Sequence, residues 1–398
     1  MIEGHTILCF ASGYDAPPTS KHHVMHLLAE SNTVLWVNYH ASRAPSVSSS
    51  DLLYILRKLK QVLTGISRPR KNLYVLTPLV IPLPDCTWAK KLNQVLLTIQ
   101  LRLALFCKKA GPLQIWSFTP DISYILGCFG EREVVYYCVD DHGSFSGYNR
   151  EQVLRDEEEL CRRADLVVTT AQALQDAKES WNRHTLLVPH GVDYEHFSRS
   201  VTDNLPVPSD IKDIPQPRLG FIGLIRDWVD LELLSEAARR RRDWHFVLIG
   251  DSTLDLARYR AERNLHFLGR KRYEDIPAYC QHFDVGLIPF KVNDLTRAVN
   301  PIKLREYLAA GLPVVSTPMP EVQQYKHMIR ISDSIESFVE AIEESLANDS
   351  EARRITRSQA MCNESWPEKV KTICEYLEGS TDFFHHEERE VHEVETED

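Results

Sequence analysis

The sequence lacks the patterns that define several other classes of protein. Its nine cysteines contain no C-x-x-C pair and no regular spacing, which argues against a disulfide framework and a zinc site. No stretch reaches the roughly 18 uninterrupted apolar residues of a membrane-spanning helix. Residues 1–10 have no basic region followed by a long apolar run, so no signal peptide is expected. These absences predict a protein of a reducing compartment, the cytoplasm, with any membrane contact peripheral.

Nucleotide-binding fingerprints of two other enzyme classes are also missing. The loop after the first expected strand, residues 11–15, has only Gly13, so it is not the G-x-G-x-x-G of nicotinamide dehydrogenases. No G-x-x-x-x-G-K-[ST] occurs, which disfavours a P-loop NTPase. No recognised nucleic-acid module accompanies the basic residues, so no nucleic-acid partner is expected.

What is present indicates a folded chain of two domains. At 398 residues the chain is about twice the usual domain size, and its 43% hydrophobic and 26% charged residues are ordinary for a folded protein. Short apolar runs alternate with amphipathic helical segments, which predicts parallel sheets covered by helices on both faces. The expected strands are residues 7–10, 34–38, 73–77, 115–117, 134–139, 166–169, 186–188, 219–222, 245–249, 266–268, 285–289, 314–316 and 328–331. The clearest expected helices are residues 151–163, 231–240, 302–310 and 335–347.

A linker divides the chain near residue 200. Four prolines lie among Ser, Asp and Asn between residues 197 and 218, which is typical of a connection between domains. We therefore expect one domain over residues 1–200, a linker over 201–217 and a second domain over 218–379. Residues 380–398 carry eight acidic residues against Arg389 and have little apolar surface, so they are expected to form a disordered acidic tail.

The basic residues gather in one part of the first domain. Residues 52–111 contain eleven basic side chains against Asp85 alone, a net charge of +10. Within them, residues 52–63 and 88–109 combine these charges with apolar and aromatic side chains, the pattern of a helix in a bilayer interface. The alternative is an ordinary amphipathic helix covering the sheet, with its charges solvated. The local charge favours an anionic membrane surface contacting residues 52–109.

Residues 300–316 form the most informative segment. Pro301 suits the first turn of a helix, whose free N–H groups and positive dipole can receive a phosphate. Lys303 adds a positive charge on the same turn, and Glu306 lies on the same face, where a carboxylate can accept hydrogen bonds from ribose hydroxyls. Gly311 then ends the helix as its C′ residue. The simpler alternative is a buried helix with a surface Lys–Glu pair.

Residues 300–316 resemble the donor-binding helix of GT-B glycosyltransferases of family 4 (glycosyl transferases group 1), in the form P-x-K-x-x-E-x-x-A-x-G-x-P-V-V. The resemblance continues in V-P-H-G-V-D at residues 188–193, in G-F-I-G at 220–223, in F-L-G-R at 267–270 and in F-D-V-G-L-I-P-F at 283–290. It covers the chain from about residue 130 to 378, whereas residues 40–115 match poorly, as expected where such enzymes bind different acceptors.

The resemblance implies a GT-B fold, in which two doubly wound Rossmann-like domains face a central cleft. The first domain would bind the acceptor and the second the nucleotide sugar. Lys303 and Arg226 would hold the diphosphate, Glu306 the ribose, and Gly269 to Tyr273 the nucleobase. The full set of donor-binding residues expected on this basis is Gly223, Arg226, Gly269, Tyr273, Asn300, Pro301, Lys303 and Glu306. A second Glu is frequent eight residues before the helix Glu, but that position is Ala298 here, so this contact to the donor sugar is missing.

Two segments of the first domain are expected beside the acceptor. Asp140, Asp141 and His142 directly follow a predicted strand, and adjacent carboxylates tend to raise the pKa of one of them. Asp140 is therefore the preferred general base and His142 an alternative, unless Asp140 or Asp141 only caps the following segment. The loop with Ser12, Gly13 and Asp15 follows the first strand and is expected on the acceptor side.

His22 and His26 are four residues apart without a third ligand, so no metal site is expected.

Together these features predict a metal-independent glycosyltransferase that moves a sugar from a nucleotide diphosphate to a hydroxyl of a lipid-linked saccharide or polysaccharide. It needs no cofactor beyond the nucleotide-sugar co-substrate and would act at the cytoplasmic face of a membrane. Two alternatives fit the same fold: a sugar-nucleotide epimerase, and a catalytically silent protein that binds sugar nucleotides or glycans.

Overall fold

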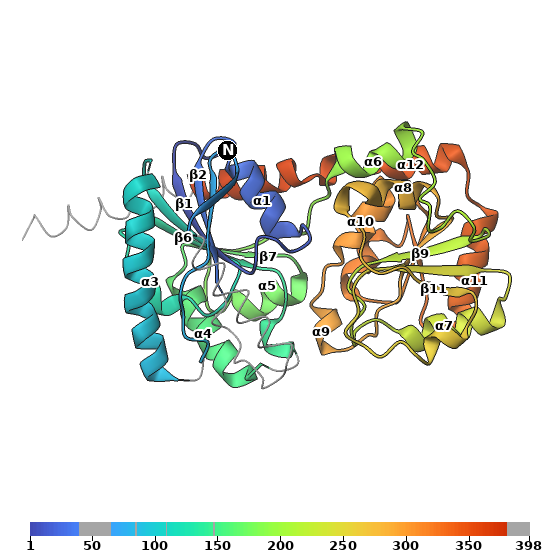
Figure 1. Ribbon diagram of the computed structural model, residues 1–398, viewed down its shortest axis with the longest axis horizontal. Helices are drawn as coiled ribbons and strands as arrows, with labels where there is room; N and C mark the ends of the chain where they lie inside the picture. The colour runs from blue at the N-terminus through green and yellow to red at the C-terminus, as the bar shows by residue number, and fades with distance from the viewer. Residues whose placement is uncertain (40–64, 84–85, 109, 146–147, 380–398) are drawn as a thin grey trace, which may run out of the picture. The chain divides into compact units, whose positions relative to one another are not determined.

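The computed structural model describes residues 1–39, 65–83, 86–108, 110–145 and 148–379 (Figure 1). The expected acidic tail and the expected membrane-facing segment 52–63 lie outside the described residues. The chain divides into two compact units: unit 1 comprises Met1–Pro189 and Lys369–Asp398, and unit 2 comprises His190–Glu368. The expected second domain began at residue 218 and ran to 379, whereas the observed division assigns residues 190–217 to unit 2 and residues from Lys369 onward to unit 1.

Unit 1 is built on an eight-stranded sheet of order β3-β4-β2-β1-β5-β6-β7-β8. All neighbouring strands are parallel except β3, which pairs antiparallel with β4 at the edge. The central strands are buried on both faces, which explains their continuous apolar sequences. The strands are β1 (Thr6–Ala11), β2 (Thr33–Asn38), β3 (Ser67–Arg70), β4 (Leu73–Leu76), β5 (Leu113–Ser117), β6 (Glu133–Cys138), β7 (Leu166–Thr169) and β8 (Thr185–Leu187).

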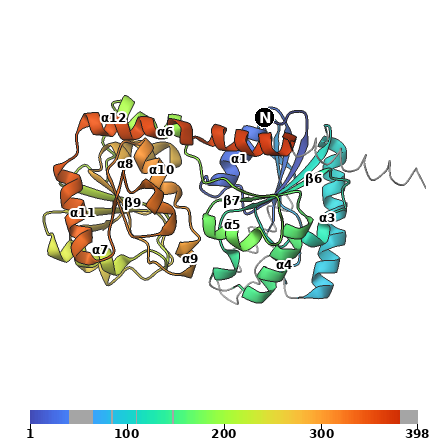
Figure 2. The same cartoon turned by 180° about the vertical axis from the view of Figure 1, so that it is seen from behind.

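Helices connect and cover these strands. The long helix α3 buries Leu97, Leu101 and Leu105 along one face, and both views show it alongside the sheet (Figures 1 and 2). Helix α4 begins where the Asn149 side chain accepts a hydrogen bond from the backbone N–H of Gln152. The described helices are α1 (Ser20–Leu28), α3 (Thr87–Lys108), α4 (Arg150–Arg163) and α5 (Gln172–Lys178), with 3-10 turns η1 (Ser123–Ile125) and η2 (His142–Ser144). No helix in the described ranges combines the length and apolarity needed to cross a membrane.

Unit 2 is built on a six-stranded parallel sheet of order β11-β10-β9-β12-β13-β14. One core, with Ile222, Phe283 and Leu308, lies under α8 and α10. The other core, with Leu234 and Phe338, lies under α7 and α11. Helices therefore cover both faces of a doubly wound sheet. The strands are β9 (Arg218–Ile222), β10 (His245–Ile249), β11 (Leu265–Phe267), β12 (Val285–Ile288), β13 (Val314–Ser316) and β14 (Arg330–Ile331).

The helices of unit 2 are α6 (Tyr194–Thr202), α7 (Leu231–Arg240), α8 (Ile276–Gln281), α9 (Asp294–Arg297), α10 (Ile302–Ala309), α11 (Ile335–Ala347) and α12 (Glu351–Ala360), with 3-10 turns η3 (Tyr259–Ala261), η4 (Tyr273–Asp275), η5 (Pro320–Tyr325) and η6 (Cys362–Glu364). Residues 366–379 form a further helical run, which belongs to unit 1 from Lys369 onward. Gly311 has φ +78° directly after the C-cap of α10, which confirms its predicted role as the C′ residue.

The expected elements agree closely with the observed ones, with two exceptions. Strand β3 was not expected, because its residues are all exposed and carry no alternating apolar pattern. The strand expected over residues 328–331 shortens to the two residues of β14. The expected helices 231–240 and 335–347 coincide with α7 and α11.

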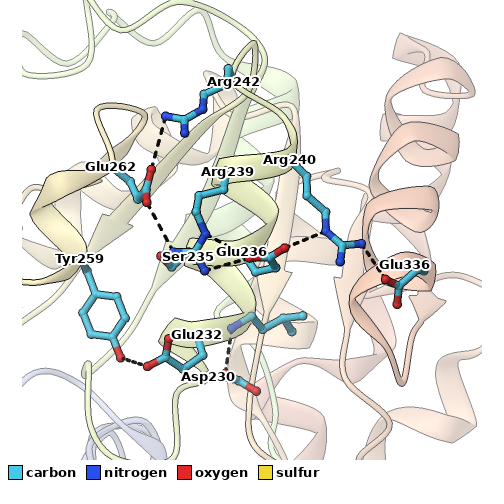
Figure 3. A network of polar contacts seen from close by, with 11 residues as sticks. Asp230, Glu232, Ser235, Glu236, Arg239, Arg240, Arg242, Tyr259, Glu262 and Glu336 are labelled. Carbon is cyan, nitrogen blue, oxygen red and sulfur yellow. Dashed lines mark hydrogen bonds and ion pairs between the residues drawn. The ribbon is translucent and has the colours of Figure 1, made fainter.

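Four consecutive arginines, Arg239 to Arg242, lie at and just beyond the end of α7, yet they do not form a free basic patch. Each has a carboxylate partner, and Figure 3 shows most of this network between α7, η3 and α11. The ion pairs are Arg239 with Glu236 and Glu262, Arg240 with Glu236 and Glu336, Arg241 with Asp243 and Glu343, and Arg242 with Glu262. Most of these side chains are solvent-accessible, so each pair stabilises little by itself. The acidic partners neutralise the four arginines, so this part of the surface is unsuited to binding an anionic partner.

Candidate active site

Lys303, one of the two residues expected at the diphosphate, and Glu306, expected at the ribose, lie together on the first turns of α10. Pro301 is the N-cap rather than a first-turn residue, so the helix proper begins at Ile302. Lys303 and Glu306 form an ion pair, with the Glu306 side chain 5% exposed and the Lys303 side chain 25% exposed. A nearly buried carboxylate beside a partly exposed ammonium, at the positive end of a helix, leaves the ammonium accessible to an anionic ligand.

Tyr273 contributes an aromatic surface near the same carboxylate. Its ring stacks on His196 with centroids 4.3 Å apart and planes 12° apart, and its hydroxyl donates to Asp193 Oδ2 at 3.4 Å. Burial raises the pKa of Tyr273, and the carboxylates of Glu306 and Asp193 raise it further. Tyr273 and Glu306 therefore lie within electrostatic reach of each other, although they are 33 positions apart in the sequence.

Asn300 has a different setting from the one expected of a donor-binding residue. Its side chain is buried, its Nδ2 donates to Glu321 Oε2 at 3.0 Å, and its Oδ1 accepts from Arg305 Nη1 at 2.6 Å. Arg305 is itself 1% exposed and lies over the Tyr325 ring, 5.1 Å from its centroid. These contacts do not support the prediction that the Asn300 amide binds the donor; they assign it to anchoring the start of α10.

Three glycines lie at the carboxyl ends of the neighbouring strands β9, β10 and β11. The backbone N–H of Gly223 donates to Ile249, and that of Gly250 donates to Gly269. Gly250 has φ +151°, and a Cβ there would lie 1.8 Å from the Gly223 carbonyl oxygen, so only glycine fits. Arg226 Nη1 donates to the backbone oxygen of Asp251 at 3.1 Å, which places its guanidinium at this same edge.

Two pockets lie at carboxyl-end loops of unit 2. The first, of about 460 Å³, is lined by residues that include Ile225, Gly250, Asp251, Arg260 and Gly269, and it therefore adjoins the segment expected at the nucleobase. The second, of about 550 Å³, lies around the N-termini of α7 and α11 and contains none of the expected donor residues. Its acidic residues Glu232 and Glu236 are engaged by Tyr259 and by arginines (Figure 3). The first pocket is thus the one consistent with the expected donor site.

In unit 1, the expected acceptor-side loop is held by residues at the ends of neighbouring strands. The backbone N–H of Tyr14 donates to Asn38 Oδ1 at 2.9 Å, and Asn38 Nδ2 donates to Thr77 Oγ1. Ser12 and Asp15 are exposed, Gly13 is partly exposed, and Ser12 Oγ accepts a hydrogen bond from Lys21. The loop is therefore fixed at Tyr14 while the side chains of Ser12 and Asp15 remain accessible.

The two helix histidines next to this loop have structural partners. His22 Nε2 lies 3.1 Å from the Tyr14 carbonyl oxygen, and His26 Nε2 lies 3.1 Å from the Tyr14 hydroxyl. Burial lowers the pKa of each to about 4, with further lowering by Lys21 at His22 and by Arg70 at His26. Among the described residues, no group of three or more His, Cys, Asp or Glu side chains could hold a metal ion.

Asp140 and Asp141 have different environments at the carboxyl end of β6. Burial raises the pKa of Asp140 to about 7, opposed by the charge of Lys21 and reinforced by Asp141. Asp141 caps η2, accepts from Gly143 N at 3.1 Å and pairs with Arg150 at 3.6 Å. The alternative that one of these residues only caps the following segment therefore applies to Asp141. The carboxyl group of Asp140 has a pKa that suits a proton acceptor near neutral pH.

His142 points into the unit rather than along its edge. Its Nε2 is buried without a hydrogen-bond partner among the described residues, and burial lowers the pKa of the ring. Beneath it Glu157 is fully buried, pairs with Lys178 at 3.3 Å and accepts from Tyr136 at 2.6 Å. This orientation disfavours His142 as the group that receives the acceptor proton. Sequence reasoning missed Glu157, Lys178 and Lys21, because no spacing pattern links them to Asp140.

The fold and the arrangement of these residues define the class of the protein. Two structures show the same architecture over nearly the whole chain. Sucrose-phosphate synthase of Thermosynechococcus elongatus is similar with a TM-score of 0.68 and 13% identity, covering 95% of this chain and 99% of its own. HepE of Anabaena, solved in complex with UDP and glucose, has a TM-score of 0.64 and 17% identity, covering 94% and 99%. The fold is GT-B.

The sequence comparisons agree with this class. Residues 216–348 match the family described as glycosyl transferases group 1. A curated relative, TuaH of Bacillus subtilis (strain 168), assigned as a teichuronic acid biosynthesis glycosyltransferase, is 28% identical over 283 residues, which are 66% of this chain and 71% of TuaH. The chain is therefore a GT-B glycosyltransferase, and the match to the group 1 family lies within unit 2. These findings confirm the GT-B resemblance found in the sequence.

The buried Asn300 amide generates a prediction about stability. Asn300→Ala removes the partner of a buried guanidinium and of the Glu321 carboxylate, so we expect the free energy of unfolding to fall by about 1–3 kcal/mol. Lys326→Ala, at an exposed position of the same unit, is the comparison and should change it by less than about 1 kcal/mol. Chemical denaturation measures both. Unchanged stability with weakened nucleotide binding in Asn300→Ala would instead assign the amide to the donor.

Proposed function

We propose that the enzyme transfers a sugar from a nucleotide-diphosphate donor to a hydroxyl of a lipid-linked saccharide or polysaccharide. The observation that carries this proposal is the Lys303–Glu306 pair at the start of α10, within electrostatic reach of Tyr273. HepE has been solved with UDP and glucose, which supports a nucleoside diphosphate donor, and the assignment of TuaH to teichuronic acid biosynthesis supports a polysaccharide acceptor.

The donor would be bound by charged side chains and by backbone groups. The accessible ammonium of Lys303, the guanidinium of Arg226 and the N-terminus of α10 would neutralise the diphosphate, so no metal ion is required for that task. Glu306 would accept hydrogen bonds from the ribose hydroxyls. Gly223, Gly250 and Gly269 carry no side chains, which would let the backbone approach the donor closely.

The chemistry would be a displacement at the anomeric carbon of the sugar. The acceptor oxygen forms the new bond to that carbon while the bond from the carbon to the diphosphate oxygen breaks, and the diphosphate leaves with the electron pair. In this proposal, the carboxylate of Asp140 takes the proton of the acceptor hydroxyl. With its pKa near 7, Asp140 is protonated in acidic solution and becomes a proton acceptor as the pH rises.

The proposal places unit 1 at an anionic membrane surface through α3. Opposite its buried face, α3 exposes a stripe of large apolar side chains at helical spacing, with Phe106 91% exposed. The stripe consists of Trp88, Leu92, Val95, Ile99, Leu103 and Phe106. Arg68, Arg70, Lys71 and Lys91 are exposed on β3, at its turn and on α3, and they supply positive charge for acidic headgroups. An exposed apolar stripe of this length is typical of a binding surface, and the nearby charges favour lipid as the partner.

The donor site generates the first functional prediction. Lys303→Ala should weaken binding of a nucleoside diphosphate by roughly 1.5–3 kcal/mol, the range for hydrogen bonds to charged groups. Glu306→Gln should weaken it too, because an amide accepts ribose hydrogen bonds less strongly than a carboxylate. Titration calorimetry with UDP and other nucleoside diphosphates measures both, with the exposed Lys326→Ala in the same unit as the control. Unchanged affinity in both variants would remove α10 from the donor site.

The second prediction concerns the base. Asp140→Asn keeps the shape but not the basicity of the side chain, so turnover should fall by about 10²–10⁴-fold while donor affinity stays near that of the unaltered enzyme. The kcat/KM of the unaltered enzyme should fall about tenfold per pH unit below pH about 7, where Asp140 becomes protonated. Steady-state kinetics with a saccharide acceptor measures both. Near-native turnover of Asp140→Asn would place the base elsewhere, and donor conversion without acceptor would indicate an epimerase.

The third prediction concerns the membrane. The double variant Leu103→Ser/Phe106→Ser should reduce partition onto acidic liposomes by roughly tenfold or more, because each change removes apolar surface from the interface. Binding of the unaltered protein should also fall as salt rises. The control is Cys107→Ser, an exposed neighbouring position outside the stripe. Sedimentation measures the partition. Equal binding by both variants would contradict the proposed surface, and apolar self-association would appear in size-exclusion chromatography instead.

A further inference from the structure

Arg305 is a charged residue that α10 buries. It lies two positions after Lys303, about 200° further round the helix, so the two side chains leave on opposite faces. The Lys303 side chain is partly exposed, whereas Arg305 is 1% exposed and is not available to a ligand. A buried guanidinium costs free energy unless its partners compensate it, and an apolar side chain of similar volume often packs without that cost. The contacts of Arg305 therefore have to account for its charge.

The guanidinium joins two segments that are far apart in the sequence. Its Nη1 donates to Asn300 Oδ1 at 2.6 Å, just before α10. Its Nε donates to Glu364 Oε2 at 3.4 Å, in η6 and 59 positions further along the chain. Because a planar guanidinium presents its donors in a fixed fork, it can hold two acceptors in one geometry. The start of α10 is thereby tied to η6.

Glu364 lies where the chain leaves unit 2. We call residues 190–193 and 362–368, at which the chain enters and leaves this unit, the paired segments. The backbone N–H of Val192 donates to the Glu364 oxygen at 2.9 Å, and that of Trp366 donates to the Val192 oxygen at 3.1 Å. These backbone bonds fix Glu364 on both sides, so its carboxylate is a firm anchor for Arg305.

The other groups around Arg305 agree with this arrangement. On the entering segment, burial and the charge of Arg305 lower the pKa of His190 to about 3, so this ring is neutral near pH 7. On the other side, Asn300 Nδ2 donates to Glu321 Oε2 at 3.0 Å. The Asn300 amide is therefore held at both its oxygen and its nitrogen. This restricts the turn that leads into Pro301, the N-cap of α10.

We propose that Arg305 and Glu364 are positioning residues for the donor: together they hold the N-terminus of α10, and with it Lys303, in place against the paired segments. The proposal deepens the proposed function and rests on the N-terminus of α10 being part of the donor site. The free N–H groups of a helix attract a phosphate only when they point at it, so a displaced first turn binds it less well. Donor affinity should then depend on Glu364, which lies outside the expected donor site.

Calorimetric titration of the full-length protein with UDP, GDP and ADP is the first test, and the tightest of the three serves as the probe. Glu364→Gln keeps the shape of the side chain but removes the charge that holds Arg305. The Kd of the probe should rise roughly three- to tenfold, within the range for residues that act on a site without touching its ligand. Glu340→Gln, which removes an exposed carboxylate of α11, is the control and should leave the Kd unchanged.

A double-mutant cycle separates positioning from a general loss of stability. In Arg305→Met, the further change Glu364→Gln should have almost no effect on nucleotide affinity, because the interaction is already broken. Where Arg305→Met does not fold, Asn300→Ala replaces it, since it removes the other end of the same connection. Additive effects of the two changes, or an unchanged Kd in folded Glu364→Gln, would overturn the proposal.

Amide hydrogen exchange of the resting protein gives a readout without nucleotide. The N–H of Leu304, in the first turn of α10, donates to the Pro301 oxygen at 3.0 Å. It should exchange faster in Glu364→Gln, while the amides of α7 keep their rates. Unchanged exchange at Leu304 would also overturn the proposal. Failure of the unaltered protein to bind any of the three nucleotides would reject the proposed donor instead, and exchange at Leu304 would still show whether Glu364 holds α10.

Discussion

Parallel strands end at one edge of their sheet, and this constraint governs where the functional residues of the chain lie. In unit 1 the loops after β1 and β6 bring Ser12 and Asp140 to the same edge, although 127 other residues separate them in the chain. In unit 2 the same rule gathers the ends of β9, β10 and β11, where Gly223, Gly250 and Gly269 leave the backbone accessible. The connecting helices then begin at these edges and add their positive ends.

Burying a charge costs free energy unless the charge is paired. This cost distinguishes the charged residues that hold the fold from the one suited to proton transfer. Glu157 and Lys178 are buried as a pair, and Arg305 is buried against Asn300, so these groups hold the fold. The arginines at the end of α7 lie at the surface and have a carboxylate partner each, and Figure 3 shows the partners of Arg239, Arg240 and Arg242. Asp140 differs from both groups, because burial raises its pKa while no ion pair among the described residues compensates it. That imbalance favours proton transfer.

Helix α3 has two apolar faces, and only one of them packs inside unit 1. Leu97 and Leu101 are fully buried, whereas Leu103 and Phe106 are exposed. From the sequence alone the two apolar faces cannot be told apart, because both belong to one apolar segment that also carries basic residues. The structure separates them, and it identifies which apolar side chains are available to the proposed membrane surface.

The sequence by itself determined the two doubly wound domains, nearly all of the strands, the helix beginning at Ile302 and its end at Gly311. These features depend on periodicity, capping and backbone conformation, which are local. The tertiary structure decided which polar residues are free to act. It buried the Asn300 amide, used Asp141 as a cap and turned His142 inward. The physical reason is that desolvation and charge pairing depend on distances between strands far apart in the chain, which no local pattern encodes.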